Sequence, residues 1–83
     1  MKENVLRGVA LLDEKIPDWR ERVNKDGLQM WDCFYCVLGQ LFGYYSTGLK
    51  ALNITTDDGY NLGFHAKTKA KQGKLEKLWK EQL

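Results

Sequence analysis

The first helix is predicted by a regular return of apolar residues near the start of the chain. Val5, Val9, Leu12 and Ile16 follow one another at steps of four, three and four, which places their side chains on one face of an α-helix. Pro17 comes next, and the residue before a proline is disfavoured in the helical conformation. We therefore expect a helix over about residues 5–16 that ends at this proline.

A second apolar stripe near the other end predicts a terminal helix that begins near Gly73. Its lysines fall mainly outside the stripe. The residues of the stripe are Leu75, Leu78, Trp79 and Leu83. A helix with one apolar face and one charged face is expected to pack on the core and expose its lysines to solvent.

The middle of the chain predicts a central helix over about residues 33–45. This stretch reads CFYCVLGQLFGYY, and Gln40 is its only strongly polar side chain. A helix that is apolar nearly all round belongs inside a fold or an oligomer. Asp32 suits its N-cap. Gly39 and Gly43 leave a groove for a neighbouring helix, unless Gly43 ends the helix.

The connecting segments carry weaker patterns. Pro17 suits the first position of a short second helix, and residues 24–27, Asn-Lys-Asp-Gly, indicate a turn. Tyr60, Leu62 and Phe64 alternate with small or polar residues, which is typical of a strand. We therefore expect a short β-hairpin or extended segment near residue 62.

Length and composition define the fold class. The chain has 83 residues, of which 43% are hydrophobic and 12% aromatic. We expect a single domain over 1–83, mainly α, as a small compact helical domain. No apolar run approaches the ~20 residues that a membrane span requires, and the first residues lack the pattern of a secretory signal. The expected protein is soluble and has no membrane partner.

Positive charge is concentrated in the last third of the chain. Residues 59–83 contain six lysines and two glutamates. Clustered lysines can neutralise nucleic-acid phosphates, but no motif of arginine and aromatic residues accompanies them. A solvated helix face is therefore the favoured interpretation, and nucleic-acid binding is the less favoured alternative.

The cysteines Cys33 and Cys36 are spaced as Cys-x-x-Cys and allow three interpretations. A buried cysteine behaves as a small apolar residue, which favours a place in the core for both. As zinc ligands they would supply half of a tetrahedral site, with His65, a carboxylate or a second subunit completing it. A redox centre is the third alternative, although the long framework of a thioredoxin-like fold is absent. No cofactor is expected under the favoured interpretation.

Aromatic rings are numerous for so short a chain, so we expect some to lie outside the core. Exposed rings near basic side chains can stack a nucleobase, and tyrosine and tryptophan are also enriched in subunit interfaces. The candidate ligand or interface residues are Trp19, Arg20, Trp31, Tyr35, Tyr44, Tyr45, Tyr60, Phe64 and Lys67.

Several landmarks together resemble a group of small proteins encoded by bacteriophages and prophages, which has no assigned activity. The most specific is the segment Cys-x-x-Cys-Val-Leu-Gly-Gln-Leu over residues 33–41. The others are the segment GVALLDE at 8–14, Pro-x-Trp at 17–19, Gly-Leu-x-Ala-Leu at 48–52, Gly-Phe at 63–64 and Leu-x-x-x-Trp at 75–79. The resemblance covers most of the chain and implies a phage origin and a setting in the host cytoplasm. It carries over no catalytic residue.

These observations predict a non-enzymatic phage accessory protein that acts by binding, in counter-defence or host takeover. Its partner would be a host protein, or a small anionic ligand such as a nucleotide signal that it sequesters. We also expect it to be a homo-oligomer, because exposed aromatic rings favour self-association. The alternative is a small regulator that is stabilised by zinc or binds nucleic acid.

Overall fold

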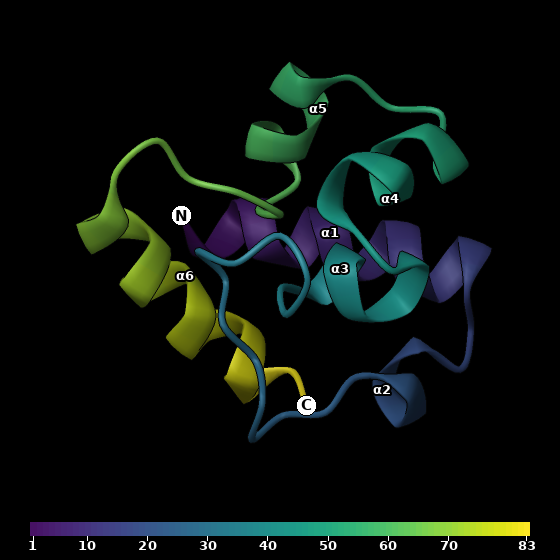
Figure 1. Cartoon of the computed structure of the whole chain (residues 1–83), viewed down its shortest axis with the longest axis horizontal. Helices are drawn as coiled ribbons and strands as arrows, with labels where there is room; N and C mark the ends of the chain where they lie inside the picture. The colour runs from purple at the N-terminus through teal and green to yellow at the C-terminus, as the bar shows by residue number, and fades with distance from the viewer.

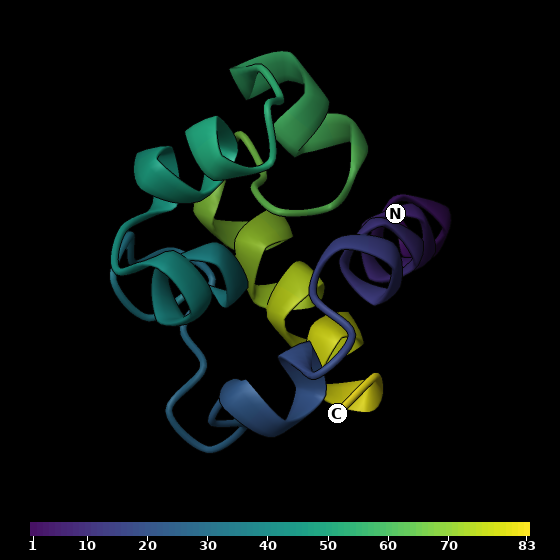
Figure 2. The same ribbon diagram turned by 90° about the vertical axis from the view of Figure 1, so that its right-hand side faces the viewer.

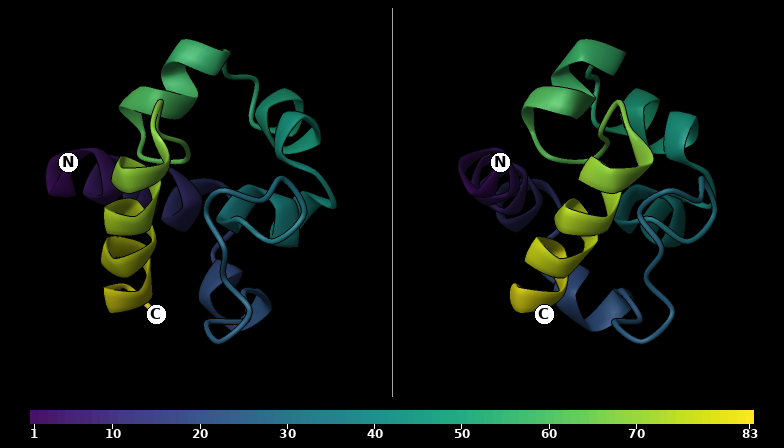
Figure 3. Two further views of the ribbon diagram at one scale, coloured as in Figure 1. Left: turned by 60° about the vertical axis from the view of Figure 1, so that its left-hand side comes forward. Right: turned by 90° about the vertical axis from the view of Figure 1, so that its left-hand side faces the viewer.

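The computed structural model describes all 83 residues and contains six helices and no strand. The helices are α1 (Lys2–Lys15), α2 (Trp19–Arg22), α3 (Val37–Phe42), α4 (Tyr45–Ala51), α5 (Thr56–Asn61) and α6 (Lys69–Glu81). Helix α1 runs along the back of the molecule in Figure 1, and α6 crosses it (Figures 1 and 3). Helices α3 and α4 pack against each other, and α5 packs on α1. The mainly helical fold class is confirmed.

The predicted stripe of α1 faces the interior. Val5, Val9 and Leu12 are buried, whereas Ile16 is half-buried at the C-cap. Gly8 lies on the same face, and a Cβ there would collide with the backbone oxygen of Leu62. Glycine is therefore required where the chain after α5 crosses α1.

The expected central helix over 33–45 is replaced by two short helices. Helix α3 begins only at Val37, because Cys36 is its N-cap and the Cys36 Sγ accepts a hydrogen bond from the Gly39 N–H at 3.3 Å. Gly43 has φ 92° and ends α3, since glycine adopts this left-handed conformation without a Cβ clash. The close approach at Gly39 is made by the backbone of Cys33 and Phe34 rather than by another helix.

The expected hairpin near residue 62 is also absent, and helix α5 lies just before it. Thr55 and Asp58 form a capping box, in which the Thr55 Oγ1 accepts from the Asp58 N–H at 3.1 Å and the Asp58 carboxylate accepts from the Thr55 N–H at 3.0 Å. This start signal determines a helix that ends at Asn61. The alternation of Tyr60, Leu62 and Phe64 therefore spans a helix end and a turn.

The terminal helix begins at Lys69, one turn earlier than the apolar stripe indicates. The Thr68 Oγ1 accepts a hydrogen bond from the Lys71 N–H at 3.2 Å and caps α6. Gly73 lies inside the helix, where a Cβ would meet open space. Leu75 and Trp79 are the fully buried members of its stripe.

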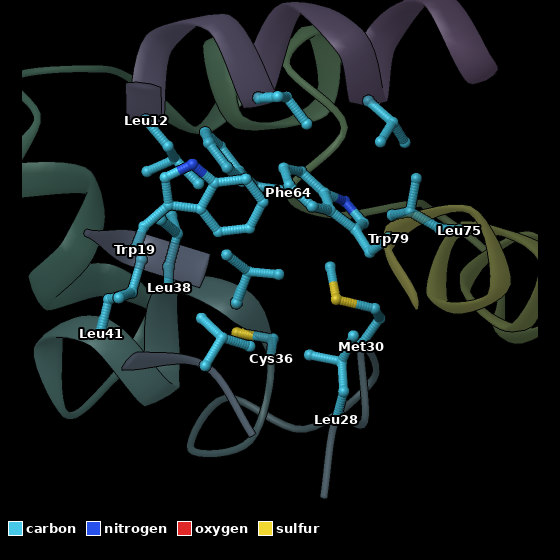
Figure 4. Close-up of a cluster of buried hydrophobic side chains, with 14 of the residues drawn as sticks. Leu12, Trp19, Leu28, Met30, Cys36, Leu38, Leu41, Phe64, Leu75 and Trp79 are labelled. Atoms are coloured by element: carbon cyan, nitrogen blue, oxygen red, sulfur yellow. The ribbon is translucent and has the colours of Figure 1, made fainter. Parts of the chain in front are cut away.

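The core is centred on Trp19, Phe64 and Trp79, each of which is at most 1% exposed. Figure 4 shows these rings meeting, with Leu28 and Met30 nearby. The Trp79 ring stacks on Phe64 with centroids 5.5 Å apart, and its Nε1–H donates to the Gly63 carbonyl oxygen at 2.6 Å. Trp19 and Phe64, which were candidates for ligand or interface contacts, are therefore core residues instead.

The accessible surface of the chain is 4944 Å² for a mass of 9.6 kDa, close to the ~5,100 Å² expected of a compact folded chain of this size. None of the six helices combines the length and the apolar character that crossing a lipid bilayer requires.

Candidate functional site

Four large aromatic side chains are exposed between residues 31 and 44. Their exposed fractions are 54% for Trp31, 59% for Phe34, 54% for Tyr35 and 39% for Tyr44. We call these four residues the aromatic surface. Three of them belong to the loop over residues 23–36, which lies on the opposite side of α6 from α1 (Figures 2 and 3). Exposed rings concentrated in this way mark an interaction site more often than scattered apolar residues do.

The loop that carries these rings is held by its own hydrogen bonds. The Asp32 Oδ1 accepts from the N–H groups of Phe34 at 2.7 Å and Tyr35 at 3.3 Å. The Gln29 N–H donates to the Tyr35 carbonyl oxygen at 3.1 Å. Asp32 was expected to cap a helix, but its carboxylate closes this turn instead. The rings are therefore presented on a defined backbone.

Three further hydrogen bonds attach the loop to the helices on either side. The Met30 N–H donates to the Glu76 Oε1 on α6 at 2.9 Å. On the other side, the Gln40 Nε2 of α3 donates to the Tyr35 carbonyl oxygen at 3.1 Å and to the Asn24 carbonyl oxygen at 3.2 Å. Both ends of the loop are thus tied to the folded core.

Within the aromatic surface, Phe34 meets Tyr44 edge to face with ring centroids 4.9 Å apart. The neighbouring Cys33 side chain raises the pKa of Tyr44 above its ordinary value, so the phenol stays neutral at physiological pH. Trp31 lies toward α6, where the Lys69 Nζ is 6.0 Å from its ring centroid. The cation is therefore beside Trp31, whereas Phe34 and Tyr44 form a pair of their own.

An open groove of about 620 Å³ lies beside the aromatic surface. Phe34 and Tyr35 form its apolar walls, and Asn24, Gln29 and Gln40 supply amide groups. No residue with a charged side chain lines it. The groove therefore extends the aromatic surface with hydrogen-bonding groups but offers no counter-charge for an anion.

A second region surrounds His65, whose ring packs between Tyr45 and Tyr60 with centroid distances of 5.2 and 5.4 Å. Burial lowers the pKa of His65 from 6.5, so the imidazole is neutral at pH 7. The Lys67 Nζ lies 5.4 Å from the centroid of the Tyr60 ring. Three aromatic groups and a cation therefore meet at this second position.

Tyr45 belongs to this region as a wall rather than as an exposed group. Burial raises the pKa of Tyr45 to about 12, and its buried hydroxyl has no hydrogen-bond partner. A Cβ at Gly59 would collide with that hydroxyl. The tyrosine therefore packs tightly between α4 and α5.

The two cysteines have different surroundings. Cys36 is 1% exposed, and burial raises the pKa of its thiol to about 11. Cys33 is half-buried, and both are free thiols. His65 packs between the two tyrosines instead of joining the cysteines, and no group of three or more His, Cys, Asp or Glu side chains is placed to hold a metal. Within one chain, the pair offers two zinc ligands of the four that a structural site uses.

Arg20, another candidate residue, is engaged in contacts within the fold. Its Nη1 lies 2.8 Å from the Asp13 carboxylate, and its Nε donates to the Gln82 carbonyl oxygen at 3.0 Å. The guanidinium covers the Trp19 ring at 4.5 Å from the centroid. Arg20 therefore joins the start of α2 to the end of α6.

The structure divides the remaining candidates into two places. Trp31, Tyr35 and Tyr44 contribute to the aromatic surface, whereas Tyr45, Tyr60, His65 and Lys67 meet around the histidine. Phe34 is the most exposed member of the aromatic surface and was not among the candidates. Its signal in the sequence is its place two residues after Asp32, where an Asx turn interrupts the helical pattern. Comparison with protein-family models, with curated proteins and with solved structures finds no match to this chain.

Proposed function

We propose that this chain is a non-enzymatic binding protein that captures a partner protein through the aromatic surface. The observation that carries the proposal is the exposure of four large rings between residues 31 and 44, outside the buried core around Trp19, Phe64 and Trp79. Rings that are not needed to complete the core are available to a partner.

The chemistry of the aromatic surface suits a protein partner. Tyrosine, tryptophan and phenylalanine are enriched in protein interfaces, and tryptophan and tyrosine often contribute most of the binding energy. The adjacent groove is open and uncharged, whereas a small ligand usually requires a cavity that encloses most of its surface. A broad contact with another protein uses both the rings and the amides of the groove.

The charge beside the aromatic surface defines the partner further. Lys69, the first residue of α6, lies at the edge of the surface with its Nζ 6.0 Å from the centroid of the Trp31 ring. Complementary charge steers association and selects among partners. The proposed partner therefore presents an apolar patch flanked by aspartate or glutamate.

The resemblance to small phage-encoded proteins supports a setting in the bacterial cytoplasm during infection. Under that setting the captured partner is a host protein, and the outcome is host takeover or the blocking of a defence. Capture of this kind needs no catalytic group.

A first experiment measures whether a second copy of the chain occupies the surface. The sequence favours a homo-oligomer, whereas capture of another protein requires that the aromatic surface be free. Under the proposal, sedimentation velocity over a range of concentrations is therefore expected to show a monomer. A dimer that disappears in the variant Phe34→Ser with Tyr44→Ser would overturn the proposal, because the aromatic surface would then be a subunit interface.

A second experiment identifies the partner with a matched control. Immobilised wild-type chain, the Phe34→Ser/Tyr44→Ser variant and a Leu6→Ser variant are exposed to a bacterial lysate. Leu6 is 44% exposed on α1, away from the aromatic surface. A retained protein is then purified and titrated by calorimetry. Support requires that it binds wild type and Leu6→Ser, that the aromatic variant loses about tenfold or more in affinity, and that Lys69→Glu weakens binding. Equal binding to all variants overturns the proposal, as does the failure of every repurified protein to bind.

A further inference from the structure

A small cavity of about 360 Å³ lies between the start of α1, the end of α5 and the first turns of α6. These elements lie around the N-terminus and the connection between α5 and α6 in Figure 1. We call it the His65 pocket, and its functional side chains are Tyr60, His65, Lys67 and Lys71. Its volume falls in the lower part of the range for small-molecule sites, which is roughly 300–1,000 Å³.

The lining of the His65 pocket is positively charged and contains no carboxylate. Lys67 and Lys71 both contribute, and neither forms an ion pair within the protein. Elsewhere in α6, Lys80 forms an ion pair with Glu76. An anion in this pocket would therefore meet two free ammonium groups and no like charge, an arrangement that suits a phosphate.

One wall of the pocket is aromatic and uncharged. The rings of Tyr60 and His65 lie 5.4 Å apart at an angle of 36°. His65 lines the pocket where it packs between Tyr60 and Tyr45, and it is neutral at pH 7 because burial lowers its pKa. Lys67 now lies over the Tyr60 ring, and its flexible side chain can turn toward an anion and expose that ring. Aromatic faces of this kind stack nucleobases.

The backbone that forms the pocket is fixed before any ligand arrives. The Asn61 carbonyl oxygen accepts from the Asn4 Nδ2 at 3.1 Å and from the Arg7 Nη2 at 3.2 Å. The Gly63 carbonyl oxygen accepts from the indole of Trp79 at 2.6 Å, and the Ala66 carbonyl oxygen accepts from Gln72 on α6 at 2.8 Å. A preformed site loses little conformational entropy on binding.

We propose that the His65 pocket binds a mononucleotide, with its phosphate between Lys67 and Lys71 and its base against Tyr60 and His65. The pocket is separate from the aromatic surface, so this ligand site goes beyond the capture of a partner protein. Its size and its two-part lining, cationic on one side and aromatic on the other, match a single nucleotide better than an inorganic phosphate or a nucleoside alone.

The test uses the full chain labelled with ¹⁵N and titrated with AMP, GMP, CMP and UMP, with adenosine and inorganic phosphate as separate probes. Amide shifts are expected at residues 60–71. The best mononucleotide should bind about tenfold more tightly than adenosine or phosphate alone. Failure of all four nucleotides to bind, or phosphate binding as tightly as the best nucleotide, overturns the proposal.

Substitutions of the lining residues test whether the nucleotide binds in this pocket. Lys67→Gln with Lys71→Gln should lower the affinity for the best nucleotide by about tenfold or more. The control Lys74→Gln with Lys77→Gln removes the same charge from exposed positions of α6 and should retain the affinity. Tyr60→Leu keeps the lysines and should remove the advantage of the nucleotide over phosphate. An equal loss in the control variant overturns the proposal.

A nucleic-acid strand shares this ligand chemistry, so a single-stranded RNA is titrated in parallel. If the strand binds more tightly than any mononucleotide, with shifts that extend along α6 to Lys74 and Lys77, the lysine face is a strand-binding surface and the mononucleotide proposal is wrong. If the mononucleotide proposal fails, the proposed capture of a partner by the aromatic surface still stands, because Phe34 and Tyr44 are not part of the pocket.

Discussion

Trp19 meets Trp79 edge to face in the core, with ring centroids 5.7 Å apart and an interplanar angle of 87°. Both indole N–H groups are satisfied: that of Trp19 donates to the Asp13 carboxylate and that of Trp79 to the Gly63 carbonyl oxygen. The pair joins α2 to α6, two segments far apart in the sequence. Its removal should therefore affect the whole fold.

We expect Trp79→Ala to lower the free energy of unfolding by about 3–5 kcal/mol, because it empties the centre of the core. Trp79→Phe should cost less, since it keeps a ring but leaves the Gly63 carbonyl oxygen without its donor. Urea unfolding followed by circular dichroism measures both. The control is Trp31→Ala on the surface, which should change stability by less than about 1 kcal/mol. A similar loss in Trp31→Ala would show that this residue packs in the interior.

Alanine substitutions at two glycines should change the stability of the protein in opposite directions. Gly63 has φ 74°, and a Cβ there would lie 2.8 Å from the Val5 nitrogen, so Gly63→Ala should destabilise the protein by at least about 1 kcal/mol. Gly73 lies inside α6 with open space around it, so Gly73→Ala should stabilise by about 0.5–1 kcal/mol. Thermal unfolding of the two variants should show shifts of opposite sign. Shifts of the same sign would contradict the backbone geometry described for one of the two positions.

The thiols should differ in their rate of alkylation. The pKa of Cys36 is raised to about 11 and its side chain is 1% exposed, and only the thiolate reacts. Iodoacetamide should therefore modify Cys33 first and reach Cys36 only when the protein unfolds. Mass spectrometry after digestion measures the two rates. Rapid labelling of native Cys36 near neutral pH would contradict its burial and favour the redox interpretation.

Removal of metal should leave the melting temperature unchanged. The expectation follows from Cys36, whose Sγ caps α3 and whose thiol stays protonated because burial raises its pKa to about 11, whereas a zinc ligand is a thiolate. The protein is purified with and without EDTA, and its zinc content is measured in parallel. A fall in melting temperature with the loss of bound zinc would support the zinc interpretation, with the second pair of ligands supplied by another subunit.

His65 should make stability depend on pH in a defined window. Burial lowers the pKa of His65 below 6.5, so between the native pKa and 6.5 the unfolded state binds more protons than the native state. The free energy of unfolding should therefore fall as the pH drops from about 6.5 toward the native pKa. Urea unfolding at several pH values tests this, with His65→Gln as the control that should lack this contribution. If the free energy of unfolding of the variant depends on pH in the same way, the dependence comes from other titrating groups.

The parts of the fold that the sequence predicted well are those with a clear apolar period. The stripe of α1 and the inner face of α6 are both confirmed, because burial of one helix face leaves a regular pattern. The segment 33–45 was misleading because hydrophobicity alone does not locate a helix boundary. The boundaries depend on the Cys36 thiol, which is not a common N-cap, and on the left-handed Gly43. Similarly, the alternation of apolar residues near Leu62 predicted a strand, but the capping box of Thr55 and Asp58 starts helix α5 just before it.

The candidate site was only partly predictable. Composition indicates that some rings must be exposed, but it does not separate Trp19, which is buried, from Trp31, which is not. That separation depends on long-range contacts, such as the pairing of Trp19 with Trp79, that leave no local signal. The grouping of Tyr60 and Lys67 with Lys71 likewise depends on how the chain turns at Gly63 between α5 and α6.

The loop that presents Phe34 and Tyr35 owes its shape to backbone hydrogen bonds and to the Asp32 carboxylate, and the exposed rings take little part in holding it. Substitution at the ring positions therefore changes what the loop recognises and leaves its conformation intact. Under the proposed capture of a host protein, the loop could therefore change its specificity by mutation at little cost in folding. A host protein that altered its surface could still be bound by a chain with the same fold.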